Sequence, residues 1–133
     1  MAKSTVHLPD AHVLIIDDDP ELQHMIRILL ERAGIQAAGA YTAGEGRHLL
    51  EQGGFHLLVL DLMLPDMDGL ELLEKLRQDA QFADLPILIL SARFDPETIA
   101  RALDLGADSY LTKPYLPRDL NQQIINMLTQ QRR

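Results

Sequence analysis

The sequence predicts an α/β protein in which five strands alternate with five helices. Five short apolar runs each suit a strand, and a segment of helical hydrophobic spacing follows each of them. The runs are continuously apolar, as expected when helices cover both faces of a parallel sheet. The chain of 133 residues has about the length of one domain, and it shows no internal repeat or low-complexity tract.

The first strand is predicted at 12–16, directly before a helix. Asp19 suits the N-cap of this helix, because its carboxylate can accept hydrogen bonds from free N–H groups of the first turn. Pro20 suits the first helical position, where its missing N–H costs nothing. Gly34 ends the helix. The residues at helical spacing on its apolar stripe are Leu22, Met25, Ile26, Leu29 and Leu30.

The second strand is predicted at 35–40 and is the weakest of the five. The helix after it begins with the capping-box spacing of Thr42 and Glu45 and ends at a glycine pair. A third strand is predicted at 56–60. Gly69 then marks a turn, with a helix beyond it, and the nearby Asp66 and Asp68 are expected to cap that turn.

The last two units follow the same order. A fourth strand is predicted at 86–90, and the helix after it begins at Pro96 and stops at Gly106. A short fifth strand is predicted at 110–112, and Pro117 opens the final helix. We therefore expect one domain over 11–130, with a mobile N-terminal extension at 1–10 and a C-terminal tail at 131–133.

The composition excludes several classes of protein. The absence of cysteine excludes disulfides, thiolate metal sites and cysteine nucleophiles. No run reaches the roughly 18 apolar residues of a membrane helix, and the first residues do not resemble a signal peptide. A net charge of −8 without a basic run argues against direct nucleic-acid binding and favours a cation or a basic partner. We expect a cytoplasmic protein with no membrane segment.

Polar and charged side chains follow four of the predicted strands. In an open parallel sheet, ligands bind outside the carboxyl ends of the strands. The residues at these ends are Asp17, Asp18, Asp19, Asp61, Ser91 and Lys113. Clustered carboxylates repel one another unless positive charge lies among them, and both Lys113 and a divalent cation such as Mg²⁺ can supply it. An aspartate can also be the nucleophile of a phosphoryl transfer, which needs mainly positioning and electrostatics.

Four motifs together resemble the receiver domain of bacterial two-component response regulators. They are "VLIIDDDP" (13–20), "LVLDLMLPDMDG" (58–69), "LILSA" (88–92) and "GADSYLTKPY" (106–115), in this order and spacing. The resemblance covers roughly residues 11–130. It implies a flavodoxin-like, doubly wound (βα)₅ fold with a five-stranded parallel sheet of order 2-1-3-4-5.

The resemblance implies a role for each residue at the strand ends. Asp61 would be the phosphoacceptor. Asp17, Asp18, Asp61 and the backbone carbonyl of Met63 would bind Mg²⁺ or Mn²⁺, and Asp19 would only cap its helix. Ser91 would donate a hydrogen bond to a phosphoryl oxygen, and Lys113 would pair with the phosphate.

Five positions would shape the pocket and the response. Ala92 and Pro114 would line the phosphate pocket, with a cis bond between Lys113 and Pro114. Tyr110 would move inward when Ser91 moves toward the phosphate. Met63 and Arg93 would tune the lifetime of the phosphoryl group. Because methionine cannot orient a water molecule by hydrogen bonding, slow autodephosphorylation is expected.

The resemblance also implies partners and an activity. The chain would take a phosphoryl group from a phosphohistidine of a sensor histidine kinase or a histidine phosphotransfer protein. It would then alter the binding of an unknown downstream protein through the surface formed by the helix from Pro96, the fifth strand and the last helix. It would be a monomer or a phosphorylation-dependent dimer. It would not be a conventional enzyme, although it would catalyse its own phosphorylation and slow autodephosphorylation.

Two other functions remain as alternatives. The chain could be a receiver-like interaction module that works without phosphorylation. A flavodoxin-like cofactor binder would need a Gly-rich or Ser/Thr-rich loop after the first strand, where this chain has aspartates that repel phosphate. Three features argue against the receiver of a winged-helix transcription factor: Ser109, the uncharged "NQQIIN" at 121–126 and the long loop before the fourth strand. They favour a stand-alone receiver, or one attached to a hybrid kinase or cyclic-dinucleotide enzyme. Whether the chain was trimmed from a longer regulator stays open.

Overall fold

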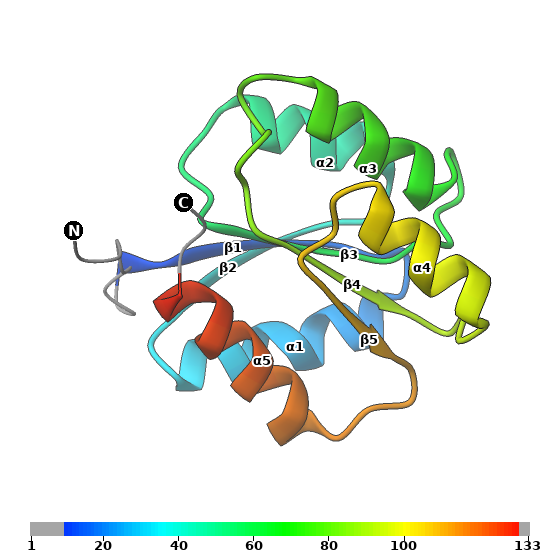
Figure 1. Ribbon diagram of the computed structural model, residues 1–133. Coiled ribbons are helices and arrows are strands. Elements are labelled where there is room, and N and C mark those ends of the chain that lie inside the picture. The colour runs from blue at the N-terminus through cyan, green and yellow to red at the C-terminus, as the bar shows by residue number, and fades with distance from the viewer. Residues whose placement is uncertain (1–9, 131–133) are drawn as a thin grey trace.

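A five-stranded parallel sheet lies between two layers of helices in the computed structural model, which describes residues 10–130 (Figure 1). The strand order β2-β1-β3-β4-β5 confirms the doubly wound, flavodoxin-like fold that the resemblance implies. The strands are β1 (His12–Ile16), β2 (Gln36–Ala40), β3 (Leu57–Leu60), β4 (Ile87–Ser91) and β5 (Ser109–Thr112). Apart from Asp10, the predicted extension at 1–10 and the tail at 131–133 lie outside the described residues.

The helices divide between the two faces of the sheet. α1 and α5 cover one face, and α2, α3 and α4 cover the other (Figure 1). Their bounds are α1 (Pro20–Arg32), α2 (Ala43–Glu51), α3 (Gly69–Gln78), α4 (Pro96–Asp104) and α5 (Pro117–Thr129). Among the described residues, no helix has the length and hydrophobicity that a membrane span requires.

Each face of the sheet carries its own hydrophobic core. Along β1, Leu14 and Ile16 pack in the cluster beneath α2, α3 and α4, whereas Val13 and Ile15 pack in the cluster beneath α1 and α5. All four side chains are fully buried. This burial on both faces explains why the strands are continuously apolar in the sequence.

Short polar side chains begin four of the five helices. Asp19 caps α1 by accepting hydrogen bonds from the N–H groups of Glu21 and Leu22 at 3.0 and 3.3 Å. Thr42, Asp68 and Asp95 cap α2, α3 and α4 in the same way. α5 begins at Pro117 without a side-chain cap. The four caps start their helices directly after a strand, or after a loop that leaves the carboxyl edge of the sheet.

The strand bounds differ slightly from the predicted ones. β4 begins at Ile87, because Pro86 has no N–H to donate to a neighbouring strand. The carbonyl of Pro86 still accepts a hydrogen bond from the N–H of Leu58 at 2.9 Å. β4 also includes Ser91, which was predicted just beyond it.

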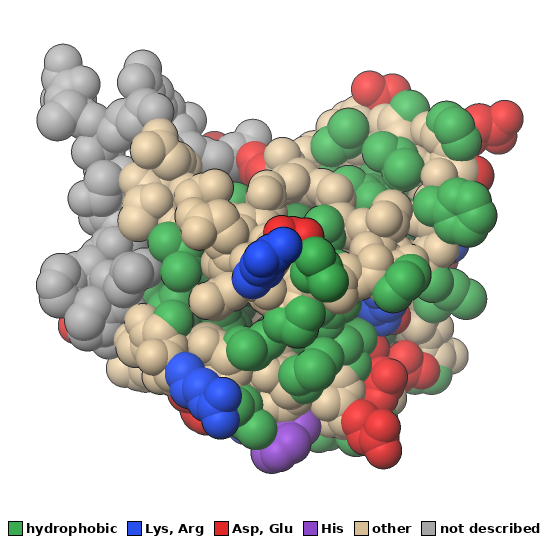
Figure 2. Space-filling view, turned by 90° about the horizontal axis from the view of Figure 1, so that it is seen from below, with side chains coloured by type: hydrophobic (Ala, Val, Ile, Leu, Met, Phe, Trp, Pro, Cys, Tyr) green, Lys and Arg blue, Asp and Glu red, His purple; other side chains and the backbone are tan. Residues whose placement is uncertain are grey.

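The face over α1 and α5 mixes apolar and charged groups. Figure 2 views the molecule from this side and shows hydrophobic side chains at the surface between separate charged ones. Met25 on α1 is 41% exposed, and Leu116 before α5 is 53% exposed. Apolar area is thus available near the carboxyl edge, which lies on the right in Figure 1.

Candidate functional site

Backbone hydrogen bonds of the sheet continue one residue past the strands and fix the predicted site residues. The N–H of Asp17 donates to the carbonyl of Ala40 at 3.0 Å, and that of Asp61 donates to the carbonyl of Ile16 at 2.9 Å. The N–H of Lys113 donates to the carbonyl of Ser91 at 2.8 Å. The parallel register therefore brings residues from β1, β3, β4 and β5 to one edge, as the strand-end argument predicts.

Three carboxylates gather at this edge. Asp17, Asp18 and Asp61 each offer an oxygen within 4.8 Å of the others. Asp17 is 1% exposed and Asp61 5% exposed, whereas Asp18 is open to solvent. Grouped carboxylate oxygens with one open side are the donors that Mg²⁺ prefers, since this ion keeps several waters and takes only one or two carboxylates. The donor set fits a divalent cation.

Lys113 pairs with two of these carboxylates. Its ammonium lies 3.0 Å from Oδ2 of Asp17 and 3.4 Å from Oδ2 of Asp61. Burial raises the pKa of Asp61 above its usual value, the Lys113 charge opposes this rise, and the Asp17 charge adds to it. Burial alone would lower the pKa of Lys113, but hydrogen bonding to Asp17 and the charges of Asp61 and Asp17 outweigh it and raise that pKa.

The loop between β3 and α3 wraps closely around Asp61. The N–H of Met63 donates to Oδ1 of Asp61 at 3.2 Å, and the Met63 side chain is 59% exposed. Gly69 packs against the backbone of this loop. A Cβ built there would lie 2.5 Å from the Cα of Leu62 and 2.6 Å from the carbonyl oxygen of Asp61. The first residue of α3 must therefore be glycine for the loop to keep its path.

Asp66 makes a longer-range contact than predicted. Its carboxylate accepts hydrogen bonds from the N–H groups of Ala43 at 2.8 Å and Gly44 at 3.0 Å, at the start of α2. These two bonds lower the pKa of Asp66. The expectation of a local cap holds for Asp68, which accepts from the N–H of Leu70 at 2.9 Å, but is wrong for Asp66, because its carboxylate reaches a neighbouring helix.

Ser91 and the two residues after it lie on the side of the site formed by β4 and the β4–α4 loop. Ser91 is fully buried, and its Oγ accepts a hydrogen bond from the N–H of Arg93 at 3.2 Å. Ala92 is exposed. The guanidinium of Arg93 donates to Oγ1 of Thr98 on α4 at 2.6 Å, and its Nε lies 3.9 Å from Asp95. The side chain of Arg93 is thus held toward α4.

Tyr110 on β5 is tied to the same loop. Its hydroxyl donates to the carbonyl oxygen of Arg93 at 2.6 Å, and its ring packs against the core beneath α2, α3 and α4. Burial raises the pKa of this hydroxyl. In this structure the tyrosine therefore lies inward, bonded to the β4–α4 loop.

The segment after β5 holds two further residues of interest. The Lys113–Pro114 peptide bond is cis, as the resemblance implies, and Pro114 is exposed. The hydroxyl of Tyr115 is buried and has no hydrogen-bond partner among the described residues. Burial, followed by the negative charges of Asp17 and Asp19, raises the pKa of Tyr115 to about 12. Tyr115 is not predictable as a site residue from the sequence, since an aromatic residue in such a segment suits simple packing.

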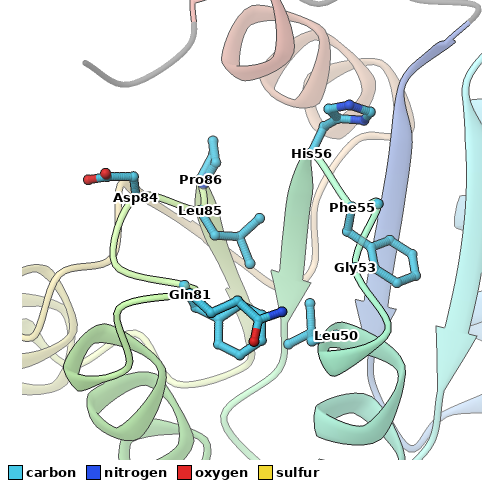
Figure 3. Close-up of a pocket in the computed structure, with 10 residues that line it drawn as sticks. Leu50, Gly53, Phe55, His56, Gln81, Asp84, Leu85 and Pro86 are labelled. Atoms are coloured by element: carbon cyan, nitrogen blue, oxygen red, sulfur yellow. The ribbon is translucent and has the colours of Figure 1, made fainter.

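Two clefts lie at opposite edges of the sheet. One of about 660 Å³ adjoins the carboxylates and is lined by Asp18, Leu62, Met63, Leu64, Pro65, Asp68 and Arg93. A smaller one of about 290 Å³ lies near the amino ends of β3 and β4, between the end of α2 and the 79–86 loop (Figure 3). The carboxylate of Asp84 points away from the hydrophobic lining of this second cleft (Figure 3). Of the predicted site residues, Asp18, Met63 and Arg93 line the first cleft, and none lines the second.

Comparisons with known proteins agree with the fold and the motifs. A family model described as "Response regulator receiver domain" matches residues 13–125. The sequence is 42% identical over 103 residues to the DNA-binding dual master transcriptional regulator RpaA of Synechocystis sp., an alignment that covers 77% of this chain and 43% of RpaA. The chain spans about half the length of the curated relatives it matches.

Solved structures match over nearly their whole length. A CheY-like response regulator receiver domain protein from Methanospirillum hungatei has a TM-score of 0.83 and 36% identity, with 89% of this chain and 93% of that chain covered. The chemotaxis response regulator CheY4 of Vibrio cholerae has a TM-score of 0.82 and 28% identity, with 87% and 97% covered. Longer transcriptional regulators and single receivers are therefore both similar to this chain, and the interpretation as a stand-alone receiver stays a prediction.

Proposed function

Because the chain belongs to the response regulator receiver domain family, we propose that it is a phosphorylation-dependent signalling switch with Asp61 as the phosphoacceptor. One observation carries this proposal. Asp61 lies at the carboxyl edge among two further carboxylates and the ammonium of Lys113, beside an open cleft. This arrangement combines a nucleophile, a cation site and a fixed positive charge.

The reaction is a transfer of a phosphoryl group from nitrogen to oxygen. A carboxylate oxygen of Asp61 attacks the phosphorus of a phosphohistidine. The new O–P bond forms as the N–P bond breaks, and the electron pair leaves with the imidazole. The product is a mixed anhydride on Asp61. Attack of water at phosphorus later releases inorganic phosphate and restores the carboxylate.

Asp17, Asp18, Asp61 and the backbone carbonyl of Met63 would hold Mg²⁺ or Mn²⁺. When bound, this cation would supply positive charge to the oxygens of the transferring group. The separation of the three carboxylates supports the assignment, since their oxygens already lie within 4.8 Å of one another. Solvent exposure of Asp18 leaves room for the waters that Mg²⁺ retains.

Protein groups would hold the remaining phosphoryl oxygens. The ammonium of Lys113 already lies 3.4 Å from Oδ2 of Asp61. It can therefore turn to an oxygen of a phosphate formed on Asp61. The hydroxyl of Ser91 would donate to another oxygen. The small side chain of Ala92 and the ring of Pro114 would leave space for the phosphate at the mouth of the site.

Ser91 and Tyr110 would carry the change to the surface of α4, β5 and α5. Movement of Ser91 toward the phosphate would pull the β4–α4 loop, to which Tyr110 is bonded through the carbonyl of Arg93. The inward tyrosine would then be favoured in the phosphorylated state. Such a response is a shift between two existing conformations.

Met63 and Arg93 would set how long the phosphoryl group lasts. Both line the cleft over the carboxylates. The thioether of Met63 is a poor hydrogen-bond acceptor, and the guanidinium of Arg93 is tied to Thr98. Neither side chain is set to orient an attacking water, so we infer slow autodephosphorylation.

The phosphodonor would be a sensor histidine kinase or a histidine phosphotransfer protein in the cytoplasm. Exposed apolar side chains near the carboxyl edge, among them Met25 and Leu116, offer area for such a partner. Phosphorylation would alter binding to a downstream protein, and the chain would act as a monomer or as a phosphorylation-dependent dimer. The receiver would extend over 11–130, and it would not contact nucleic acid itself.

Intact-protein mass spectrometry tests the proposal. After incubation with acetyl phosphate and Mg²⁺, we expect one gain of about 80 Da, as for any single phosphorylation. The gain should disappear without Mg²⁺ and in Asp61→Asn. If a matched histidine kinase also leaves the mass of the wild-type protein unchanged, the phosphorylation-independent interaction module becomes the better account.

A further inference from the structure

A buried glutamine on α1 holds the loop that carries the first carboxylate. Gln23 is 1% exposed. Its Nε2 lies 2.9 Å from the carbonyl oxygen of Asp17, 2.5 Å from that of Ala40 and 3.2 Å from that of Ile15. One side-chain amide thus joins the end of β1, the loop after it and the end of β2.

Gly39 on β2 provides the space for this amide. A Cβ built on Gly39 would lie 1.7 Å from Oε1 of Gln23, far inside van der Waals contact. Any side chain at position 39 would therefore push the amide off its carbonyl partners. Gln23 and Gly39 form a matched pair on neighbouring elements.

Packing alone does not account for a glutamine here. Its Oε1 is buried and has no hydrogen-bond partner among the described residues. Leaving a buried polar atom unpaired is unfavourable, and an apolar side chain of similar size would avoid that cost. The Nε2 contacts are what the glutamine adds to this position.

The contacts lead directly to the acidic cluster. The backbone of Asp17 is fixed on both sides, since its N–H donates to the carbonyl of Ala40 and its own carbonyl accepts from Gln23. The carboxylate of Asp17 accepts from the N–H of Asp19 at 2.9 Å and from Lys113 at 3.0 Å. Losing the Gln23 amide would free the main chain at the residue whose carboxylate faces the cation site.

We propose that Gln23 is a positioning residue for divalent-cation binding, acting through the backbone of Asp17. The proposal rests on the function proposed above, in which Asp17 is a ligand of Mg²⁺. Gln23 touches neither the cation nor the phosphoryl group. Its amide sets where the Asp17 carboxylate lies, and Gly39 keeps that amide in place.

Titration calorimetry with Mg²⁺ alone tests this role. Gln23→Met keeps the length and volume of the side chain but removes its N–H donors. We expect it to weaken Mg²⁺ binding about tenfold, the lower end of the loss seen when outer-shell partners of a metal are removed. The control Gln122→Met, on the exposed side of α5, should bind Mg²⁺ as the wild type does.

A second test leaves Gln23 in place and changes Gly39 instead. Gly39→Ala should displace the amide and weaken Mg²⁺ binding to a similar extent. In a Gln23→Ala background, Gly39→Ala should have little further effect, because no amide remains to be displaced. This lack of additivity would show that Gly39→Ala acts through the amide of Gln23. If Gln23→Met fails to fold, the Gly39→Ala variants alone decide the question.

The outcomes separate this inference from the function on which it rests. If Gln23→Met or Gly39→Ala is folded by circular dichroism and binds Mg²⁺ within twofold of the wild type, Gln23 has only a packing role. If the wild type itself binds no Mg²⁺, or Asp18→Asn binds it equally well, the proposed cation site is wrong. Tenfold losses in both single variants, without additivity, support the positioning role.

Discussion

The ammonium of Lys113 lies 3.0 Å from a carboxylate oxygen of Asp17, although 96 residues separate them along the chain. The same ammonium reaches Asp61 at 3.4 Å. One lysine therefore connects the ends of β1, β3 and β5. Its charge offsets part of the repulsion between two carboxylates that are almost fully buried.

Removing this charge should destabilise the protein in the absence of Mg²⁺. Lys113→Met keeps most of the aliphatic side chain but leaves Asp17 and Asp61 without their cation. We expect the free energy of unfolding at pH 7 to fall by about 2–3 kcal/mol, somewhat less than for a fully buried pair, because Lys113 is 22% exposed. Urea titrations with and without Mg²⁺ measure this, and Mg²⁺ should restore much of the loss.

An exposed lysine provides the matched control. Lys75 pairs with Glu71 at 3.3 Å on the surface of α3. Lys75→Met should change the free energy of unfolding by less than about 0.5 kcal/mol, whether or not Mg²⁺ is present. Equal losses in the two lysine variants would contradict a special role for Lys113 in the stability of the acidic cluster.

Replacing the proposed phosphoacceptor should stabilise the fold. Asp61→Asn removes a buried negative charge next to Asp17 while keeping the side-chain shape. We expect the free energy of unfolding at pH 7 without Mg²⁺ to rise by about 1 kcal/mol, as is common when an active-site charge is removed. Urea titration would refute this if the variant were less stable than the wild type.

The stability difference between Asp61→Asn and the wild type should depend on pH, because it follows from the pKa of Asp61. Burial raises this pKa in the folded state above its usual value of 3.8. Protonated Asp61 therefore favours the folded state, and this contribution is lost as the pH rises through the folded pKa. The advantage of Asp61→Asn should be absent below pH 3.8 and grow above it. A difference independent of pH between 3 and 7 would contradict the assignment.

The lifetime of the phosphoryl group should depend on position 63. Met63→Asn introduces a side chain that can hydrogen bond a water at the mouth of the site. We expect its phosphorylated form to decay several-fold faster than that of the wild type, because a positioned polar group assists the attack of water. Loss of the phosphate-sized mass over time measures the decay. A wild-type half-life of seconds, made longer by Met63→Asn, would contradict slow autodephosphorylation.

The hydroxyl of Tyr110 should stabilise the β4–α4 loop. Tyr110→Phe removes the hydrogen bond to the carbonyl of Arg93 and should lower the free energy of unfolding by about 1 kcal/mol. Amide hydrogen exchange of residues 92–95 should accelerate. Tyr41→Phe, at an exposed position after β2, serves as the control and should leave both measurements unchanged. Unaltered exchange in Tyr110→Phe would show that the hydroxyl does not hold the loop.

The contact of Asp66 with α2 should slow hydrogen exchange at the two amides that donate to its carboxylate. In Asp66→Ala, hydrogen exchange at Ala43 and Gly44 should accelerate, and the melting temperature should fall. The exposed Asp84→Ala should have neither effect. Since the pKa of Asp66 is lowered, its contribution is present above pH 3.8 and is lost as the pH falls through the folded pKa. Identical exchange in both variants would argue against the contact.

The sequence was sufficient for the fold and for the grouping of the charged residues. Alternating apolar runs and helix caps predicted the elements, and the rule that parallel strands end at one edge predicted that Asp17, Asp61 and Lys113 would meet. The roles of these residues in phosphorylation stay predictions. Geometry at the carboxyl edge follows from backbone pairing, which hydrophobic patterning specifies well.

Side-chain contacts between different helices and strands were harder to predict from the sequence. Met25 was predicted on the buried stripe of α1 but is 41% exposed, and Gln23 is buried instead. The amide of Gln23 lies against Gly39, where a Cβ would meet it at 1.7 Å, and hydrophobic periodicity does not register such a contact. The reach of Asp66 to α2 was missed for a similar reason, because its two partners lie 22 and 23 residues earlier in the chain.

Gly69 has a consequence for how a genetic screen of this protein would be interpreted. It carries no charge and donates nothing to a phosphate, yet a Cβ there would meet the backbone of Leu62 and Asp61 at 2.6 Å or less. In a random library selected for loss of signalling, substitutions at 69 should score as severely as those at Asp61 itself. Ranking positions by phenotype would therefore place Gly69, whose role is to leave space for the backbone, beside Asp61, whose role is chemical. Only the structure distinguishes these two roles.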